Sequence, residues 1–222
     1  SAPPTDRYRP TYRADELRLI AQQAQRGESL CFVGIAGAGK SNLVNSVRDE
    51  ARMATYLGTA ASQVHFAVVD ANTWQKTPLS LWTLMATSLE ALTSQWPAPA
   101  TEGAAIPFAE EERALLRLRN RLRVVCQEQK RQVVFVLDDF DQAFKLGPLA
   151  MLEQLNTLRS EGNRNRLSYL IFTKLLPHVL GRQHQLETTS KFYDLFKHQI
   201  YALEPYAASD ARQMLTFLNE GA

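Results

Sequence analysis

The chain has 222 residues, of which 45% are hydrophobic and 22% are charged, a composition that predicts one large domain with a substantial core and the beginning of a second. The formal net charge is only +2 and charges of both signs are interspersed, so composition alone does not call for nucleic acid or a membrane as partner. No apolar stretch approaches the roughly 18 to 20 residues that span a bilayer, and the polar start of the chain lacks a signal-peptide core. We therefore expect a cytoplasmic protein without a membrane partner.

The cysteines and histidines indicate neither a disulfide nor a metal centre. Only two cysteines occur, Cys31 in an apolar run and Cys126 late in a helical pattern, which fits a reducing compartment and two small buried side chains. The histidines have no metal-ligand spacing and form no arrangement typical of a nucleophilic triad. They are His65, His178, His184 and His198.

The first elements follow the order helix, strand, glycine-rich turn, helix. Apolar residues recur at helical spacing from Ala14 to Arg26, with acidic residues in the first turn and Gly27 after the last. Leu30 to Val33 is a short apolar run typical of a buried strand. A helical segment is predicted from Lys40 to about Tyr56.

Further apolar runs, separated by helical stretches, predict more buried strands. They cover 64–69, 133–137 and 167–172, and a last extended segment covers 200–203. Strands that alternate with helices imply a parallel sheet covered on both faces, so the predicted fold is α/β with three layers, α/β/α. The Pro/Ala/Gly-rich segment 96–107 is expected to be a surface loop.

The segment from Gly34 to Ser41 matches the phosphate-binding pattern G-x-x-x-x-G-K-[ST], in the required position between a strand and a helix. Glycines let backbone amides turn toward phosphate oxygens, the helix N-terminus adds its positive dipole end, and Lys40 reaches the β and γ phosphates. The Ser41 hydroxyl is then a magnesium ligand. The residues predicted to bind nucleotide here are Gly34, Ala36, Gly37, Ala38, Gly39, Lys40, Ser41 and Asn42.

The apolar run 133–137 ends in two aspartates, the pattern of a Walker B strand. Asp138 directly follows the run and is the predicted magnesium ligand, directly or through water. Asp139 is the candidate general base, with Asp141 as an alternative, and both also fit a simple turn or helix cap. Since Asp139 is one methylene shorter than the glutamate common in related ATPases, we expect slow turnover.

With both motifs placed, the chain resembles the AAA+-like P-loop ATPase domains of the STAND class and, nearly as well, the initiator or origin-recognition ATPases. The resemblance implies a lead-in over the adenine site (1–13), an ATPase core (14–204) and the start of a helical lid (205–222). It places Tyr8 and Pro10 in the base pocket, although an ordinary packed aromatic fits Tyr8 as well. It also makes Thr173 and Lys174 candidate γ-phosphate sensors at the end of a strand, although a solvated side chain fits Lys174 equally well.

Two sets of arginines could contact a macromolecular partner or simply face solvent. Arg164 and Arg166 fit either an arginine finger acting on a neighbouring subunit or a solvated basic turn. Arg113, Arg117 and Arg121 share one helix face, which favours a solvated face over a nucleic-acid contact because Leu115, Leu118, Leu122 and Val125 are expected to pack inward. Self-association or a protein partner is therefore preferred over nucleic acid.

The sequence thus predicts an ATPase that binds ATP or ADP with Mg²⁺ and acts as a conformational or oligomerisation switch in a larger STAND-type signalling or defence regulator. The alternative is an AAA+ initiator or loader that acts on DNA, which the stretch from Asp70 to Thr77 resembles. The segment from Ser190 to Tyr206 resembles the STAND lid entry and favours the first. A nucleotide-binding scaffold that never hydrolyses is the third interpretation.

Overall fold

The computed structural model describes residues 13–93 and 109–203. The predicted adenine-pocket residues Tyr8 and Pro10, the predicted loop 96–107 and the predicted lid from residue 205 onward lie outside this part of the chain. Within the described residues, none of the helices combines the length and apolar character that crossing a membrane would require.

The core of the fold is one sheet of five parallel strands in the order β2-β3-β4-β1-β5. Every apolar run predicted as a strand is a strand, and the observed ends differ from the predicted ones by one residue at most. The strands are β1 (Leu30–Val33), β2 (Val64–Asp70), β3 (Gln132–Asp138), β4 (Leu167–Thr173) and β5 (Ile200–Ala202). The predicted parallel sheet is confirmed.

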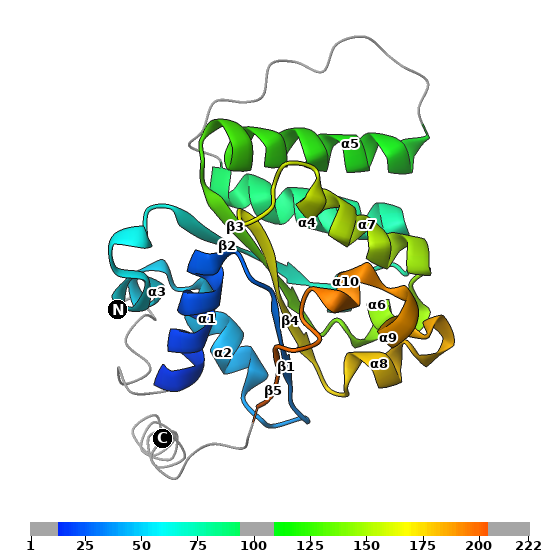
Figure 1. Cartoon of the computed structure of the whole chain (residues 1–222), viewed down its shortest axis with the longest axis horizontal. Helices are drawn as coiled ribbons and strands as arrows, with labels where there is room; N and C mark the ends of the chain where they lie inside the picture. Colours follow the sequence, from blue (N-terminus) through cyan, green and yellow to red (C-terminus); the bar gives the residue numbers. More distant parts are fainter. Residues whose placement is uncertain (1–12, 94–108, 204–222) are drawn as a thin grey trace, which may run out of the picture.

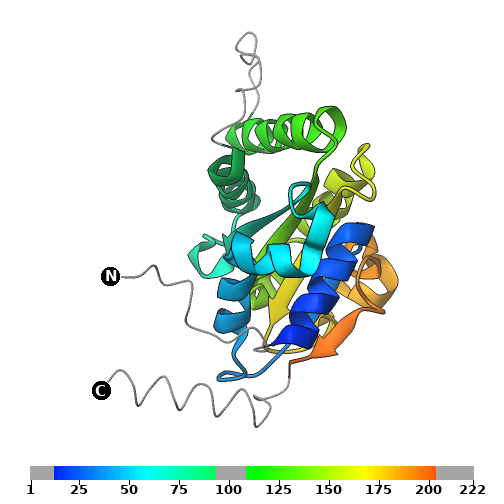
Figure 2. The same ribbon diagram turned by 90° about the vertical axis from the view of Figure 1, so that its left-hand side faces the viewer.

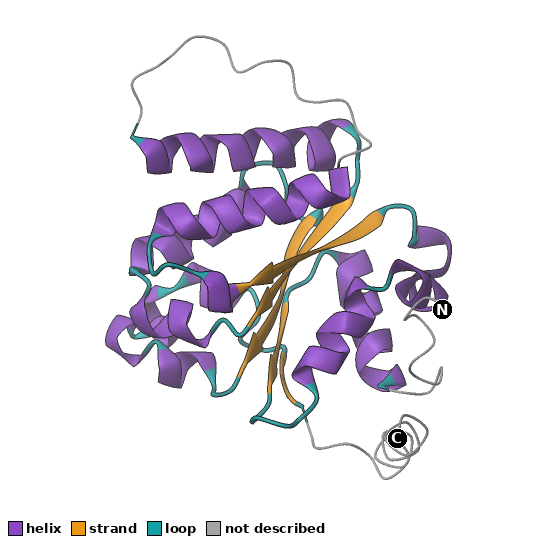
Figure 3. Ribbon diagram, turned by 180° about the vertical axis from the view of Figure 1, so that it is seen from behind, coloured by secondary structure: helices purple, strands orange, loops and turns teal. Residues whose placement is uncertain are grey.

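Helices cover both faces of the sheet, as predicted (Figure 1). One layer contains α1 (Ala14–Arg26), α2 (Lys40–Arg48) and α3 (Glu50–Leu57). The other contains α4 (Pro78–Thr93), α5 (Glu110–Leu122), α6 (Asp141–Leu146), α7 (Leu149–Ser160), α8 (Pro177–Leu180), α9 (Leu186–Thr189) and α10 (Lys191–Asp194). Figure 3 shows the sheet between these layers from behind.

Short helical turns complete the described structure. They are 3-10 turns η2 (Gly58–Ala60), η3 (Ala71–Thr73) and η5 (Arg182–His184), and a π-helical turn η4 (Arg123–Glu128) that continues α5. Figure 2 shows α5 as the outermost helix, lying against α4. On α5 and η4, Leu118, Leu122 and Val125 are buried as predicted, and Leu115 is half-buried.

The protein has two hydrophobic cores, one on each face of the sheet. Side chains that alternate along each strand pack into one core or the other. On β4, which is buried along its whole length, Phe172 stacks on Phe32 of β1 in the layer of α1 to α3, with ring centroids 5.7 Å apart. Tyr169 faces the other layer and stacks on Phe135 of β3 at 6.3 Å. This double burial explains why the strands are continuous apolar runs.

The single helix predicted from Lys40 to about Tyr56 is wrong, because the chain forms two helices that meet at Asp49. The backbone of Asp49 is extended, with φ −77° and ψ 100°, which ends α2. Its carboxylate accepts a hydrogen bond from the Arg52 backbone N–H at 3.1 Å and thereby caps α3. Capping of this kind satisfies a backbone donor that a helix start otherwise leaves unpaired.

Both cysteines are buried and free, as predicted. Burial raises the pKa of each thiol to about 12, so neither is ionised near neutral pH. The Cys31 Sγ lies 3.8 Å from the Thr173 hydroxyl oxygen, across the β1–β4 pair.

Candidate nucleotide-binding site

The predicted phosphate-binding loop lies between the end of β1 and the start of α2, at the carboxyl edge of the sheet. Gly37 and Gly39 have φ values of 83° and 82°, in the left-handed region that glycine enters without steric cost. A Cβ on Gly34 would lie 3.1 Å from the Leu203 Cβ and 3.2 Å from that of Ala38, so the loop packs closely against the end of β5. The predicted order of strand, loop and helix is confirmed.

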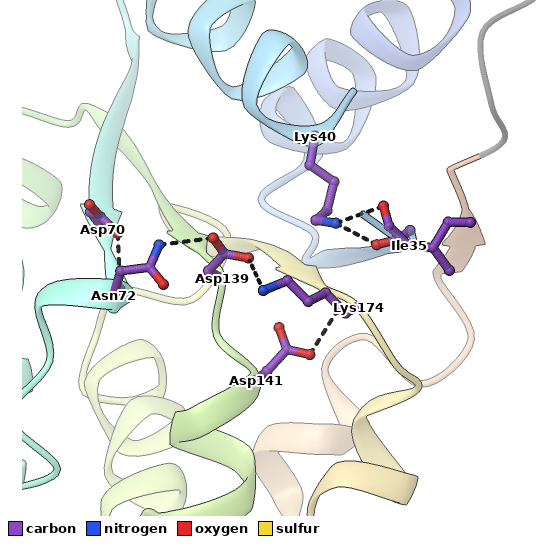
Figure 4. Close-up of polar contacts among 8 residues, drawn as sticks. Ile35, Lys40, Asp70, Asn72, Asp139, Asp141 and Lys174 are labelled. Carbon is purple, nitrogen blue, oxygen red and sulfur yellow. Dashed lines mark hydrogen bonds and ion pairs between the residues drawn. The ribbon is translucent and has the colours of Figure 1, made fainter. Parts of the chain in front are cut away.

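Lys40 occupies the first turn of α2, and its side chain points back into the loop (Figure 4). Its Nζ donates hydrogen bonds to the carbonyl oxygen of Gly34 and, at 3.2 Å, to that of Ile35. The residue is only 8% exposed. The ammonium group is therefore held at the loop by neutral carbonyl oxygens. It can exchange them for phosphate oxygens, which bind a cation more strongly because they are charged.

A cavity of about 310 Å³ brings the phosphate loop together with the ends of β3 and β4. Its lining residues are Ala36, Gly37, Gly39, Lys40, Ser41, Asn42, Asp139 and Lys174. The amino end of α2 opens into it, which adds the positive end of the helix dipole to two lysine charges. Such a cavity suits a polyanion of the size of a nucleotide's phosphates.

Asp138 ends β3, in register with Asp70 at the end of β2. Burial raises the pKa of the Asp138 carboxyl, and the neighbouring charges of Asp139 and Asp70 raise it further, while Lys40 opposes the shift. A divalent cation beside these oxygens would relieve both the repulsion and the desolvation, so the donor set fits magnesium. Asp138 is not itself among the residues that line the cavity, where Asp139 forms the wall.

Asp139 lines the cavity and has a left-handed backbone with φ 50°, which is uncommon for a residue with a side chain. One carboxylate oxygen accepts a hydrogen bond from the Asn72 side-chain amide at 2.8 Å. The other lies 3.5 Å from the Lys174 Nζ, close enough for an ion pair, yet it has no hydrogen-bond donor. Asn72, Asp139 and Lys174 thus connect the ends of β2, β3 and β4 (Figure 4).

Asn72 was not among the predicted site residues. It lies in η3, directly after β2, and its backbone N–H bonds the Asp70 carboxylate at 2.9 Å. A polar residue at the carboxyl end of a parallel strand is the signal that could have identified it.

The two predicted sensor residues have different surroundings. Lys174 lines the cavity, and its backbone N–H donates to the Asp141 carboxylate at 2.9 Å, which ties Asp141 to the loop after β4. Thr173 is fully buried with its hydroxyl near Cys31, and it is not among the residues that line the cavity. Its carbonyl oxygen instead accepts the Gly34 N–H at 2.9 Å, which holds β4 to the phosphate loop.

The arginines with open roles lie away from this cavity. Arg166 belongs to the turn before β4, at the amino edge of the sheet, and its guanidinium donates to the Lys130 carbonyl oxygen. Neither Arg164 nor Arg166 can therefore contact nucleotide bound in this chain's own cavity. Among the described residues, no group of three or more His, Cys, Asp or Glu side chains gathers as a metal cluster.

Comparison with solved structures finds similar folds in archaeal proteins. Cdc6p from Pyrobaculum aerophilum aligns with a TM-score of 0.59 at 15% identity, covering 96% of this chain and 51% of that one. The Aeropyrum pernix ORC1 protein in complex with DNA has a TM-score of 0.59 at 22% identity, with 94% and 49% covered. The Aeropyrum pernix ORC2 protein in its ADPNP-ADP complexes has a TM-score of 0.63 at 16% identity, with 96% and 53% covered.

The chain spans about half the length of these solved chains, and at such low identity the likeness concerns the fold, which is that of a P-loop NTPase. A search of curated protein sequences gave no match. A family model described as the AAA ATPase domain matches residues 9–172, which include the phosphate loop, Asp138 at the end of β3 and Asp139 after it. This match covers well over half of the sequence, and the chain therefore belongs to the AAA ATPase domain family.

Proposed function

We propose that this chain binds Mg-ATP in the cavity at the carboxyl edge of the sheet, hydrolyses it slowly, and serves as the nucleotide-dependent switch of a larger protein. The observation that carries the proposal is the meeting of the phosphate loop with Asp139 and Lys174 around one cavity. A loop, a carboxylate and a second cation from three separate elements match the needs of phosphoryl transfer, which relies on positioning and charge stabilisation.

The roles follow from the chemistry of each group. Loop amides and Lys40 bind phosphate oxygens, and the Ser41 hydroxyl with the Asp138 carboxylate holds the magnesium ion, directly or through water. Magnesium supplies charge neutralisation on the phosphates when bound. Asp139 orients the attacking water, and its bond to Asn72 keeps one oxygen occupied in the nucleotide-free state.

Switching requires groups that change partners when nucleotide enters. Lys40 now bonds two carbonyl oxygens of its own loop, and Lys174 pairs with Asp139. Both cations have stronger partners in phosphate oxygens, so binding transfers them from intramolecular acceptors to the ligand. Release of Lys174 from Asp139 then reports the γ-phosphate to the segment that follows β4.

Calorimetric titration with Mg-ATP tests the proposal. Lys40→Ala is expected to weaken ATP binding by at least about tenfold, because a charge-assisted contact is worth about 1.5 to 3 kcal/mol. Lys197→Ala is the matched control, since Lys197 forms an exposed ion pair with Asp194 and lies outside the cavity. Equal affinity of wild type and Lys40→Ala, with both folded, would remove the basis of the proposal.

For the larger protein we propose an initiator-type ATPase that acts on DNA, the alternative given by the sequence. The likeness to Cdc6p and to an ORC1 protein bound to DNA supports this more than a STAND signalling role. On α5 and η4, three arginines form ion pairs with carboxylates: Arg121 with Glu90, Arg119 with Glu161 and Arg123 with Glu128.

Fluorescence anisotropy with duplex DNA, with and without Mg-ATP, distinguishes the two contexts when carried out on the full-length protein. Affinity that depends on ATP and falls steeply with salt supports the initiator. No DNA binding, together with ATP-dependent self-association in light scattering, would instead support the STAND regulator. That interpretation rests on the lid-entry segment from Ser190 to Tyr206, whose last residues lie outside the described part of the chain.

A further inference from the structure

Arg13 lies directly before α1, far from the phosphate loop in sequence, yet its side chain contacts that loop. One terminal nitrogen, Nη2, donates a buried hydrogen bond to the Ala38 carbonyl oxygen at 2.8 Å. The other, Nη1, bonds the Glu16 carboxylate at 2.7 Å. Arg13 is only 4% exposed and has a left-handed backbone with φ 51°. A buried arginine in an uncommon conformation points to a specific task.

The bonded carbonyl belongs to the peptide that joins Ala38 and Gly39. In a planar trans peptide, the carbonyl oxygen and the N–H of the next residue point in opposite directions. Holding the Ala38 oxygen on Arg13 therefore directs the Gly39 N–H to the opposite side of the loop. Gly39 lines the cavity, whereas Ala38 is buried and does not.

This peptide needs an external restraint, because glycine follows it. Gly39 has φ 82°, and a residue without Cβ is equally tolerant of other backbone conformations. The local chain therefore does not by itself prevent the peptide from rotating and presenting its carbonyl oxygen to the phosphates. An oxygen there would repel the ligand that the amide is meant to bind.

We propose that Arg13 is a positioning residue that fixes the Ala38–Gly39 peptide with its N–H directed into the phosphate site. Its action is orientation rather than charge, since the Glu16 carboxylate balances the guanidinium at 2.7 Å. The proposal rests on the proposed ATP-binding function and adds a residue from outside the motif. Preorganised amides of this kind bind anions without a reorganisation cost.

The test compares Arg13→Ala with Arg18→Ala in Mg-ATP titrations and in amide NMR of the nucleotide-free protein. Arg18 is a matched control, because it belongs to α1 and forms an exposed ion pair with Asp15. Arg13→Ala is expected to raise the ATP Kd about tenfold, the value of one oriented hydrogen bond, while Arg18→Ala changes it less than about twofold. The Gly39 amide resonance should be sharp in wild type and broadened or doubled in Arg13→Ala.

Glu16→Gln separates orientation from charge, because it keeps the guanidinium and an acceptor but removes the countercharge. It should leave the ATP Kd within about twofold, whereas a loss as large as that of Arg13→Ala would overturn the orientation argument. If Arg13→Ala does not fold, Arg13→Lys replaces it. A single ammonium lacks the planar fork that spans both partners, so a Kd increase of about threefold and a broadened Gly39 resonance are expected.

Unchanged ATP affinity and a sharp Gly39 resonance in a folded Arg13 variant overturn the proposal. Failure of the proposed function looks different, because wild type itself would then bind no Mg-ATP. The Gly39 resonance of the nucleotide-free protein still decides the role of Arg13 in that case.

Discussion

Asp138 carries an electrostatic penalty that a cation would remove. Its pKa is raised by burial and by the charges of Asp139 and Asp70, so its ionised form disfavours the folded state. The sign follows from linkage: a carboxyl with a raised folded-state pKa stabilises the fold below its unfolded value of about 4, and this stabilisation is lost as pH rises through the folded-state pKa. Above the folded-state pKa of Asp138, the nucleotide-free protein bears the full electrostatic penalty.

Asp138→Asn is therefore expected to stabilise the nucleotide-free protein at pH 7.5 while it removes the magnesium requirement of ATP binding. We expect a gain of about 1 kcal/mol, or roughly 2 to 4 °C in Tm, that disappears below about pH 4. Thermal melts against pH and ATP titrations with Mg²⁺ or EDTA measure the two effects. A variant that keeps the wild-type magnesium dependence would contradict the ligand role.

Asp139→Asn is expected to lower single-turnover phosphate release by at least about 100-fold and to leave the ATP Kd within about threefold. An amide cannot accept a proton from water, whereas it still fits the hydrogen bond from Asn72 after an amide flip. Asp141→Asn is the matched comparison, because Asp141 already accepts the Lys174 N–H. If Asp141→Asn abolished release and Asp139→Asn did not, the general base would be Asp141.

His65 gives the protein a dependence on mildly acidic pH. Burial lowers the pKa of the imidazole, and Arg131, whose Nη1 lies 2.9 Å from the ring, lowers it further, while Glu50 opposes the shift. A base with a lowered folded-state pKa stabilises the fold above its unfolded value of about 6.5, and this stabilisation is lost as pH falls through the folded-state pKa.

His65→Gln should therefore lose less stability than wild type between pH 7.5 and 5.5. The expected difference is below about 1 kcal/mol, because the ring is half-exposed. Chemical denaturation at the two pH values measures it. Parallel losses of stability in both proteins would exclude His65 as the titrating group.

At the residue scale, the sequence could place the groups that belong to one contiguous motif. Lys40, Ser41 and the loop glycines required only the pattern and its strand-to-helix context. Asn72 and the role of Arg13 depend on approaches between distant segments, which no local pattern specifies. The sequence could not tell which way the Thr173 side chain points, because strand alternation decides the face, and here the hydroxyl lies on the Cys31 side.

At the element scale, the strands were predictable and the break between α2 and α3 was not. Apolar residues continue at helical spacing across the break, from Leu43 and Val47 to Met53 and Leu57, and all four pack in one core. The apolar periodicity therefore gives no sign of the helix break. At Asp49, the side-chain bond that caps α3 replaces the continuation of α2. Strand order was also beyond prediction, because β1, β3 and β4 are apolar on both faces and carry no signal of their neighbours.

The Asp49 cap is expected to stabilise α3 without any part in nucleotide binding. Asp49→Ala should reduce the free energy of unfolding by about 1 kcal/mol, the usual value of an N-cap, and leave the ATP Kd unchanged. Asp49→Ser keeps a capping oxygen and should restore most of the loss. Urea denaturation measures the stability change, and a variant as stable as wild type would mean that α3 is held by its core contacts alone.

At the scale of the whole molecule, strand order turns separate motifs into one site. All five strands are parallel, so the loop after β1, the aspartates at the end of β3 and Lys174 after β4 reach the same edge. Because β4 lies between β1 and β3, the segments that follow these three strands are neighbours at this edge. A ligand bound there contacts strands whose side chains pack into both cores. Its binding energy therefore adds to the stability of the entire domain rather than to one loop.

Mg-ATP should consequently raise the Tm of wild type in a concentration-dependent way. At 100 times the Kd, mass action predicts about 2.7 kcal/mol, which corresponds to a shift of roughly 5 to 11 °C for a domain of this size. Scanning calorimetry should show one cooperative transition that moves as a whole, because both helical layers pack on the same sheet. The Tm of Lys40→Ala should rise much less than that of wild type at the same ATP concentration. An equal rise in Tm would mean that nucleotide binds elsewhere on the molecule.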